Sequence, residues 1–150
     1  MYYVAIDPGL KQSAYIVADL YKPLESAIID NRLMRWQLIN SNITSGMPAR
    51  LIIERPVCQK YAGSDVGETI RWTGIFQASW PEWEEVVLIS RQKVKMRTVG
   101  KKATDAKIKA YLKERFANTP EWFKNFKADI WQAYALLVVY LDEIRGVKWN

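Results

Sequence analysis

The sequence contains no histidine among its 150 residues. This absence excludes Ser-His-Asp and Cys-His catalysis, and it excludes zinc sites built with imidazole ligands. A catalytic mechanism in this chain would therefore depend on carboxylates, lysine, tyrosine or a hard metal ion.

Cysteine and long apolar runs are also scarce. The single cysteine, Cys58, cannot form an intramolecular disulfide, which fits a reducing compartment. No apolar run approaches the roughly 20 residues that span a bilayer, and the N-terminal segment lacks the basic and apolar stretches of a signal peptide. We expect one compact domain over residues 1–150, with the cytoplasm as its default compartment.

The charge is positive overall, with 22 Lys and Arg against 16 Asp and Glu. This excess favours an anionic partner such as nucleic acid, although solubility alone would also explain it. Residues 91–102 carry six positive charges and no acid, so the excess is concentrated in that segment. A basic run is usually a solvated face, but this one lies between a predicted strand and a predicted helix.

Hydrophobic periodicity predicts an α/β domain with a mixed sheet. Strands are expected over residues 2–6, 13–20, 27–29, 32–38, 51–53 and 86–89. Helices are expected over residues 65–80, 104–116 and 129–145. Residues 40–48 and 56–64 are rich in polar and turn-forming residues, so we expect loops there.

Three acids occupy the ends of these elements. Asp7 and Glu54 directly follow apolar strands, and Asp129 begins the last helix. A carboxylate at the end of a buried strand needs a partner or a cation, because burying it alone is costly. Carboxylates without nearby His or Cys select hard cations. The pattern therefore predicts a Mg²⁺ or Mn²⁺ site, and two such ions can hydrolyse a phosphodiester.

Each acid also has a purely structural interpretation. Asp7 begins Asp-Pro-Gly, a favourable turn sequence. Glu54 could pair with Arg55 or with another base. Asp129 and Gln132 match a capping box, in which the first side chain caps the helix and the second reaches back.

The acidic segments resemble the motifs of RuvC-type Holliday junction resolvases. Residues 5–9, AIDPG, resemble the motif that delivers the first catalytic Asp, and residues 51–54, LIIE, resemble the one that delivers the catalytic Glu. Residues 94–108 resemble the segment that carries a functional lysine, and residues 128–136, ADIWQAYAL, resemble the final motif. The compact size and the Trp-rich middle resemble a phage-type member.

The resemblance implies an RNase H-like fold, with a mixed central sheet flanked by helices. It also implies paired nicking of a four-way DNA junction by a homodimer that uses Mg²⁺, with two ions per active site. By this resemblance Asp7, Glu54 and Asp129 would be metal ligands, and Lys95 would lie near the scissile phosphate.

One position departs from the family. The family commonly has an acid three residues after the last catalytic Asp, and Gln132 stands there in this chain. A neutral amide can coordinate weakly through its oxygen, or support another ligand, but it does not offset metal charge. Asp105 is a less favourable substitute, because an acid in the first turn of a helix complements the dipole.

DNA contacts are expected from the basic segment and from one aromatic residue. The predicted phosphate-binding residues are Arg91, Lys93, Lys95, Arg97, Lys101 and Lys102. Tyr61 lies in a predicted loop beside a lysine, where it could stack on an unpaired base or simply be a surface tyrosine. The helix at 65–80 carries Trp72, Ile75, Phe76 and Trp80, so we expect part of it to form a dimer contact.

Two other functions fit the same residues. One is a different RNase H-like nuclease that acts on RNA–DNA hybrids or on other branched DNA. The other is an inactive junction-binding protein, in which the acids are turn and cap residues and Gln132 marks lost chemistry.

Overall fold

In the computed structural model, the described residues, 1–56 and 64–148, form one five-stranded sheet with the strand order β3-β2-β1-β4-β5. The strands are β1 (Tyr2–Asp7), β2 (Gln12–Asp19), β3 (Lys22–Asp30), β4 (Ala49–Arg55) and β5 (Val87–Ser90). β1, β2 and β3 pair antiparallel, whereas β4 runs parallel to both β1 and β5. The sheet is therefore mixed, as predicted.

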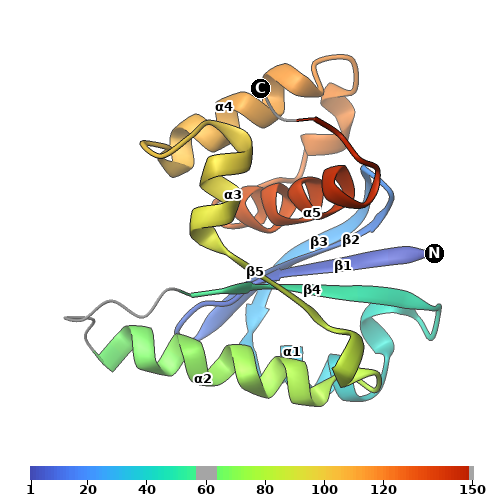
Figure 1. The fold of residues 1–150 in the computed structure, drawn as a ribbon. Coiled ribbons are helices and arrows are strands. Elements are labelled where there is room, and N and C mark those ends of the chain that lie inside the picture. The colour runs from blue at the N-terminus through green and yellow to red at the C-terminus, as the bar shows by residue number, and fades with distance from the viewer. Residues whose placement is uncertain (57–63, 149–150) are drawn as a thin grey trace.

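Helices cover both faces of the sheet (Figure 1). On one face lie α1 (Asn31–Ile39) and α2 (Ser64–Ser79). On the other lie α3 (Arg91–Thr98), α4 (Asp105–Arg115) and α5 (Ile130–Ile144). Short 3₁₀ turns occupy Asn42–Thr44, Trp83–Glu85 and Pro120–Phe123. Among the helices of the described residues, none combines the length and the apolar character that crossing a bilayer requires.

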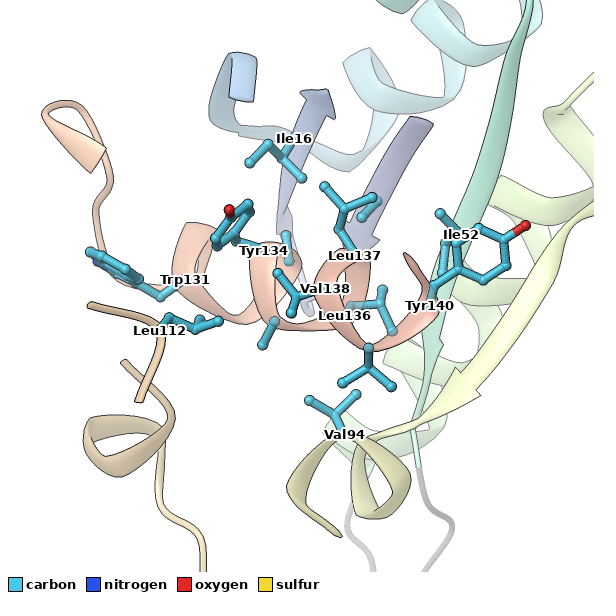
Figure 2. Close-up of a cluster of buried hydrophobic side chains, with 14 of the residues drawn as sticks. Ile16, Ile52, Val94, Leu112, Trp131, Tyr134, Leu136, Leu137, Val138 and Tyr140 are labelled. Carbon is cyan, nitrogen blue, oxygen red and sulfur yellow. The ribbon is translucent and has the colours of Figure 1, made fainter. Parts of the chain in front are cut away.

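Helix α5 forms the centre of the larger core. Every residue from Ile130 to Asp142 is buried, because the sheet covers one side of the helix while α3 and α4 cover the other. Figure 2 shows Val94 of α3 and Leu112 of α4 against α5, opposite Ile16 and Ile52 of the sheet. A helix that is buried all round is apolar all round, which explains the run ALLVVYL in the sequence.

The alternation of side chains along the strands sets which face each one meets. In β1, Tyr3 and Ala5 join the core around α5, while Val4 and Ile6 pack toward α1 and α2. The next residue on the α5 side is therefore Asp7. The same alternation in β4 directs Glu54, two residues after Ile52, toward α5.

The direction of α5 places its N-terminus near Asp7 and Glu54. Near the C-terminal end of α5, Tyr140 packs on Tyr3 at the start of β1, with ring centroids 6.0 Å apart. Helix α5 therefore runs antiparallel to β1, and its N-terminus lies toward the strand end that carries Asp7 (Figure 1).

A buried ion pair joins α5 to α4 at the other end of the helix. Asp142 is fully buried, and its carboxylate accepts hydrogen bonds from Arg115 Nη1 at 2.5 Å and Nη2 at 2.6 Å. The Tyr21 hydroxyl donates to the same carboxylate at 2.6 Å. Burial and this hydrogen bond raise the pKa of Tyr21 to about 12, so the phenol keeps its proton.

One sequence prediction about secondary structure was wrong, and one helix was not predicted. Residues 32–38, predicted as a strand, lie in α1, where Met34 and Leu38 are buried one turn apart and Asp30 accepts from the Arg32 backbone N–H. Residues 40–48, predicted as a loop, include the 3₁₀ turn Asn42–Thr44. The first eight residues of the basic segment form α3, a helix that the sequence analysis did not predict.

Candidate active site

Asp7 and Glu54 lie side by side at the carboxyl ends of two neighbouring parallel strands. The register pairs Ile6 with Ile53, so the next residues along each strand are the two acids. Their carboxyl groups share a hydrogen bond. Burial, followed by the charge of Glu54, raises the pKa of Asp7 well above its ordinary value. Burial also raises the pKa of Glu54, which is only 6% exposed.

Asp129 lies at the third corner of the site. It directly precedes α5 and is exposed, and within the described part of the chain its side chain makes no hydrogen bond that caps the helix. Its negative charge contributes to the raised pKa values of both Asp7 and Glu54. The capping-box interpretation of Asp129 and Gln132 is therefore wrong.

The three acids do not form one tight cluster. Over residues 1–56 and 64–148, no group of three or more His, Cys, Asp or Glu side chains meets the geometry of a metal site. Asp7 and Glu54 touch, and Asp129 is close enough for its charge to act on both. That all three ligate a shared cation stays a prediction.

Arg91 faces into the site. Its Nη1 lies 3.6 Å from Glu54 Oε1 and donates to Gln132 Oε1 at 3.2 Å, while its Nη2 pairs with Asp105. The base that pairs with Glu54 is therefore Arg91. From the sequence, Arg91 was expected only to bind DNA. Strand order could have located it, because β5 lies beside β4 and ends at the same sheet edge.

The turn after Asp7 is fixed by a buried polar network. The Gly9 N–H donates to Ser13 Oγ at 3.1 Å, and the Ser13 hydroxyl donates to Asn31 Oδ1 at 2.6 Å. Asn31 Nδ2 donates back to the Gly9 carbonyl at 3.0 Å. A Cβ at Gly9 would lie 2.1 Å from the Gln12 carbonyl oxygen, so only glycine fits. The Asp-Pro-Gly turn therefore holds the strand end that carries Asp7.

A pocket of about 540 Å³ opens beside Glu54. Its lining includes the cations Arg91, Lys95 and Lys101, the acid Asp65 opposite them on α2, and apolar side chains such as Val66 and Met96. The cations come from α3 and the turn that follows it, so this wall of the pocket is basic. The site thus combines a carboxyl pair with an adjoining surface suited to an anion.

The other predicted DNA-binding residues are more dispersed. Lys93 Nζ lies 2.8 Å from Glu143 Oε1 on α5, which holds this side chain in an ion pair. Arg97 lies in the last turn of α3, and Lys102 is exposed in the turn that follows. Tyr61, predicted to stack on a base, lies outside the described residues, as does most of the predicted loop at 56–64.

The donor atoms fit a hard divalent cation. Asp7 and Glu54 present carboxylate oxygens, which Mg²⁺ and Mn²⁺ prefer. Two carboxyl groups in contact repel when both are ionised, and a cation between them removes that repulsion. Burial is the largest cause of the raised pKa values of the pair, and a bound cation would favour the ionised carboxylates.

Comparison with solved structures identifies the fold. A T. thermophilus RuvC structure, described as in complex with Holliday junction substrate, superposes with a TM-score of 0.72 and 13% sequence identity, covering 97% of this chain and 96% of that one. This chain has the RNase H-like fold of RuvC. A second Thermus thermophilus RuvC structure gives a TM-score of 0.71 at 13% identity, with 99% of each chain covered.

The likeness to RuvC is one of structure and not of overall sequence. No protein-family model matches the chain. A search of curated proteins also finds no match. The predicted RNase H-like fold is confirmed, whereas the resemblance to phage-type members stays a prediction.

Proposed function

We propose that this chain is a divalent-metal-dependent endonuclease that cuts four-way DNA junctions. The observation that carries the proposal is the contact pair Asp7–Glu54, which lies next to a basic pocket and within electrostatic reach of Asp129. The RuvC fold supports it, since a RuvC structure with this fold is described with a Holliday junction.

The chemistry can be divided among the residues of the site. Asp7, Glu54 and Asp129 would hold Mg²⁺ or Mn²⁺, which supplies Lewis acidity and an activated water when bound. Lys95 and Lys101 would bind the phosphate backbone in the pocket that they line. Contacts with phosphates give affinity without reading sequence, so junction shape would determine selectivity.

A second function is favoured by one feature of the site. The ion pair between Arg91 and Glu54 already neutralises one carboxylate, and Gln132 adds no charge. A site of this kind would suit a protein that binds junctions and cuts them weakly or not at all.

A cleavage assay separates these functions. We expect the full chain with Mg²⁺ to nick a synthetic four-way junction, and to act much less on linear duplex or RNA–DNA hybrid of the same sequence. A junction that is retarded in a gel but stays intact with Mg²⁺ and with Mn²⁺ would support the binding protein. Preferred cleavage of the hybrid would indicate another RNase H-like nuclease.

We further propose that the chain acts as a homodimer through the face formed by α1 and α2. Phe76 and Trp80, which the sequence analysis considered for this contact, are buried against the sheet. The exposed apolar surface of this face includes Leu33 and Trp36 on α1, with Trp36 55% exposed. Between the two helices, a hollow of about 570 Å³ could receive a side chain of the second copy.

Trp36→Glu tests this face. The charge should break an apolar dimer contact, so we expect the variant to sediment as a monomer at concentrations where the wild type is a dimer. Ile144→Glu is the matched control, since Ile144 is 53% exposed on α5, across the sheet from α1. Analytical ultracentrifugation measures both; a dimer that survives Trp36→Glu would exclude α1 from the interface.

A further inference from the structure

The guanidinium of Arg91 lies among the acidic side chains of the site. It contacts Glu54 at 3.6 Å and Gln132 at 3.2 Å, and it pairs with Asp105. Only 28% of the Arg91 side chain is exposed. An arginine buried to this degree is retained only where its charge and its donors are matched, and here carboxylate and amide oxygens match them.

Helix ends account for this position. Ser90 caps α3 by accepting from the Lys93 backbone N–H at 3.2 Å, so Arg91 is the first residue of the helix. Asp105 begins α4, and Gln132 lies in the first turn of α5. The N-termini of α3, α4 and α5 therefore meet at the guanidinium of Arg91. Through Glu54, the same guanidinium also contacts the end of β4.

The side-chain amide of Gln132 is a neutral hydrogen-bond partner for the guanidinium of Arg91. It is 4% exposed, and its side-chain oxygen is engaged by Arg91. A neutral amide oxygen is a weak ligand for a divalent cation but a good acceptor for a guanidinium. The oxygens of Glu54 and Gln132 that could have formed a second cation site face Arg91.

We propose that Arg91 is a built-in cation that takes the place of a second metal ion, so that each active site holds one divalent cation, between Asp7, Glu54 and Asp129. This inference rests on the proposed nuclease function and replaces the pair of ions that the sequence resemblance implies. The guanidinium also lines the pocket beside Glu54, where it would face the phosphate that a second ion would otherwise contact. The guanidinium belongs to the chain itself, so its charge does not depend on metal supply.

Two variants change Arg91 or its amide partner Gln132, and a third serves as a control outside the site. Arg91→Ala with Gln132→Asp removes the guanidinium and supplies an acid in its place. Gln132→Asp alone keeps the guanidinium, which should pair with the new carboxylate. Lys93→Ala removes a neighbouring cation that is held by Glu143, outside the site.

Mn²⁺ electron paramagnetic resonance gives a readout that is independent of catalysis. Two Mn²⁺ ions a few ångströms apart produce an exchange-coupled spectrum, whereas ions bound elsewhere on protein or DNA do not. We expect the wild-type full chain to show no coupled signal when titrated with Mn²⁺, alone or bound to a four-way junction. Gln132→Asp and Lys93→Ala should behave like the wild type, and the double variant should gain the coupled signal.

Calorimetric titration with Mn²⁺ completes the test. One ion per wild-type chain and two per double variant are expected, together with binding of the first ion on the order of tenfold tighter once the guanidinium is gone. A coupled signal or two ions in the wild type would overturn the inference while leaving the nuclease proposal in place. A double variant that folds and still binds one ion would also overturn it. Absence of any site-bound ion in the wild type would refute the nuclease proposal as well.

Discussion

Asp7→Asn is expected to abolish junction cleavage, lowering the rate by at least about a thousandfold, while junction binding persists. After burial, the charges of Glu54 and Asp129 raise the pKa of Asp7, and the charge of Arg91 opposes them. Under the proposed function, losing its charge would weaken the cation site, and a bound cation contributes several kcal/mol to the stability of the transition state. Single-turnover cleavage of a labelled junction measures the rate, and gel retardation measures binding.

The stability of this variant separates lost chemistry from lost folding. Because the pKa of Asp7 is raised in the folded state, the folded protein binds more protons than the unfolded chain at pH values between the unfolded and folded pKa of Asp7. The free energy of unfolding therefore falls as the pH rises through this range. Without metal, Asp7→Asn should therefore be at least as stable as the wild type at neutral pH. Asp19→Asn, at the exposed end of β2, is the matched control and should cleave normally. Normal cleavage by Asp7→Asn would remove Asp7 from the metal site.

Asp142→Ala is expected to lower the free energy of unfolding by about 3–5 kcal/mol, the usual effect of breaking a buried ion pair. Asp142 is fully buried, and its removal takes away the carboxylate that accepts hydrogen bonds from the guanidinium of Arg115 and the hydroxyl of Tyr21. Urea denaturation monitored by circular dichroism gives the value. Glu68→Ala, which breaks an exposed pair with Arg71, should have a much smaller effect.

A double variant shows whether the Asp142 effect comes from an unpaired charge. Arg115→Leu with Asp142→Leu removes both charges and should recover much of the stability that Asp142→Ala loses, because apolar residues can replace a buried pair at little cost. Equal destabilisation by the single and double variants would mean that the packing of this region, rather than its electrostatics, stabilises the fold.

The positions of Asp7 and Glu54 could be predicted, because the alternation of side chains along a strand can be read from the sequence and determines where those side chains lie in the sheet. A run of apolar residues ending in an acid places that acid at a sheet edge, and two such parallel strands place two acids together. For the segment at 32–38 the same rules misled. Met34, Trp36 and Leu38 alternate as in a strand, but Met34 and Leu38 also lie one helical turn apart. In α1, Met34 and Leu38 are buried and Trp36 is 55% exposed. Packing against the core therefore determines that the segment is a helix, which the spacing of apolar residues alone did not.

The role of Arg91 could not be found from local sequence. Six cations in one segment look alike in a sequence, and only the positions of α4 and α5 direct this one inward to Asp105 and Gln132. The partner of Gln132 could not be predicted from local sequence either. Its spacing from Asp129 matches a capping box, yet a guanidinium from a distant helix competes successfully for the amide.

At one end of helix α5 lie Asp129, which directly precedes it, and Gln132 in its first turn; at the other end Asp142 pairs with Arg115. At 1.5 Å per residue the two ends are about 20 Å apart, and the helix between them is buried on every side. Sliding along its axis would separate Gln132 from Arg91 and strip Asp142 of its partners together. Substitutions of Asp142 should therefore change the geometry of the carboxylates at the far end of the helix. For the same reason, the residues at each end of α5 limit which substitutions the other end can accept.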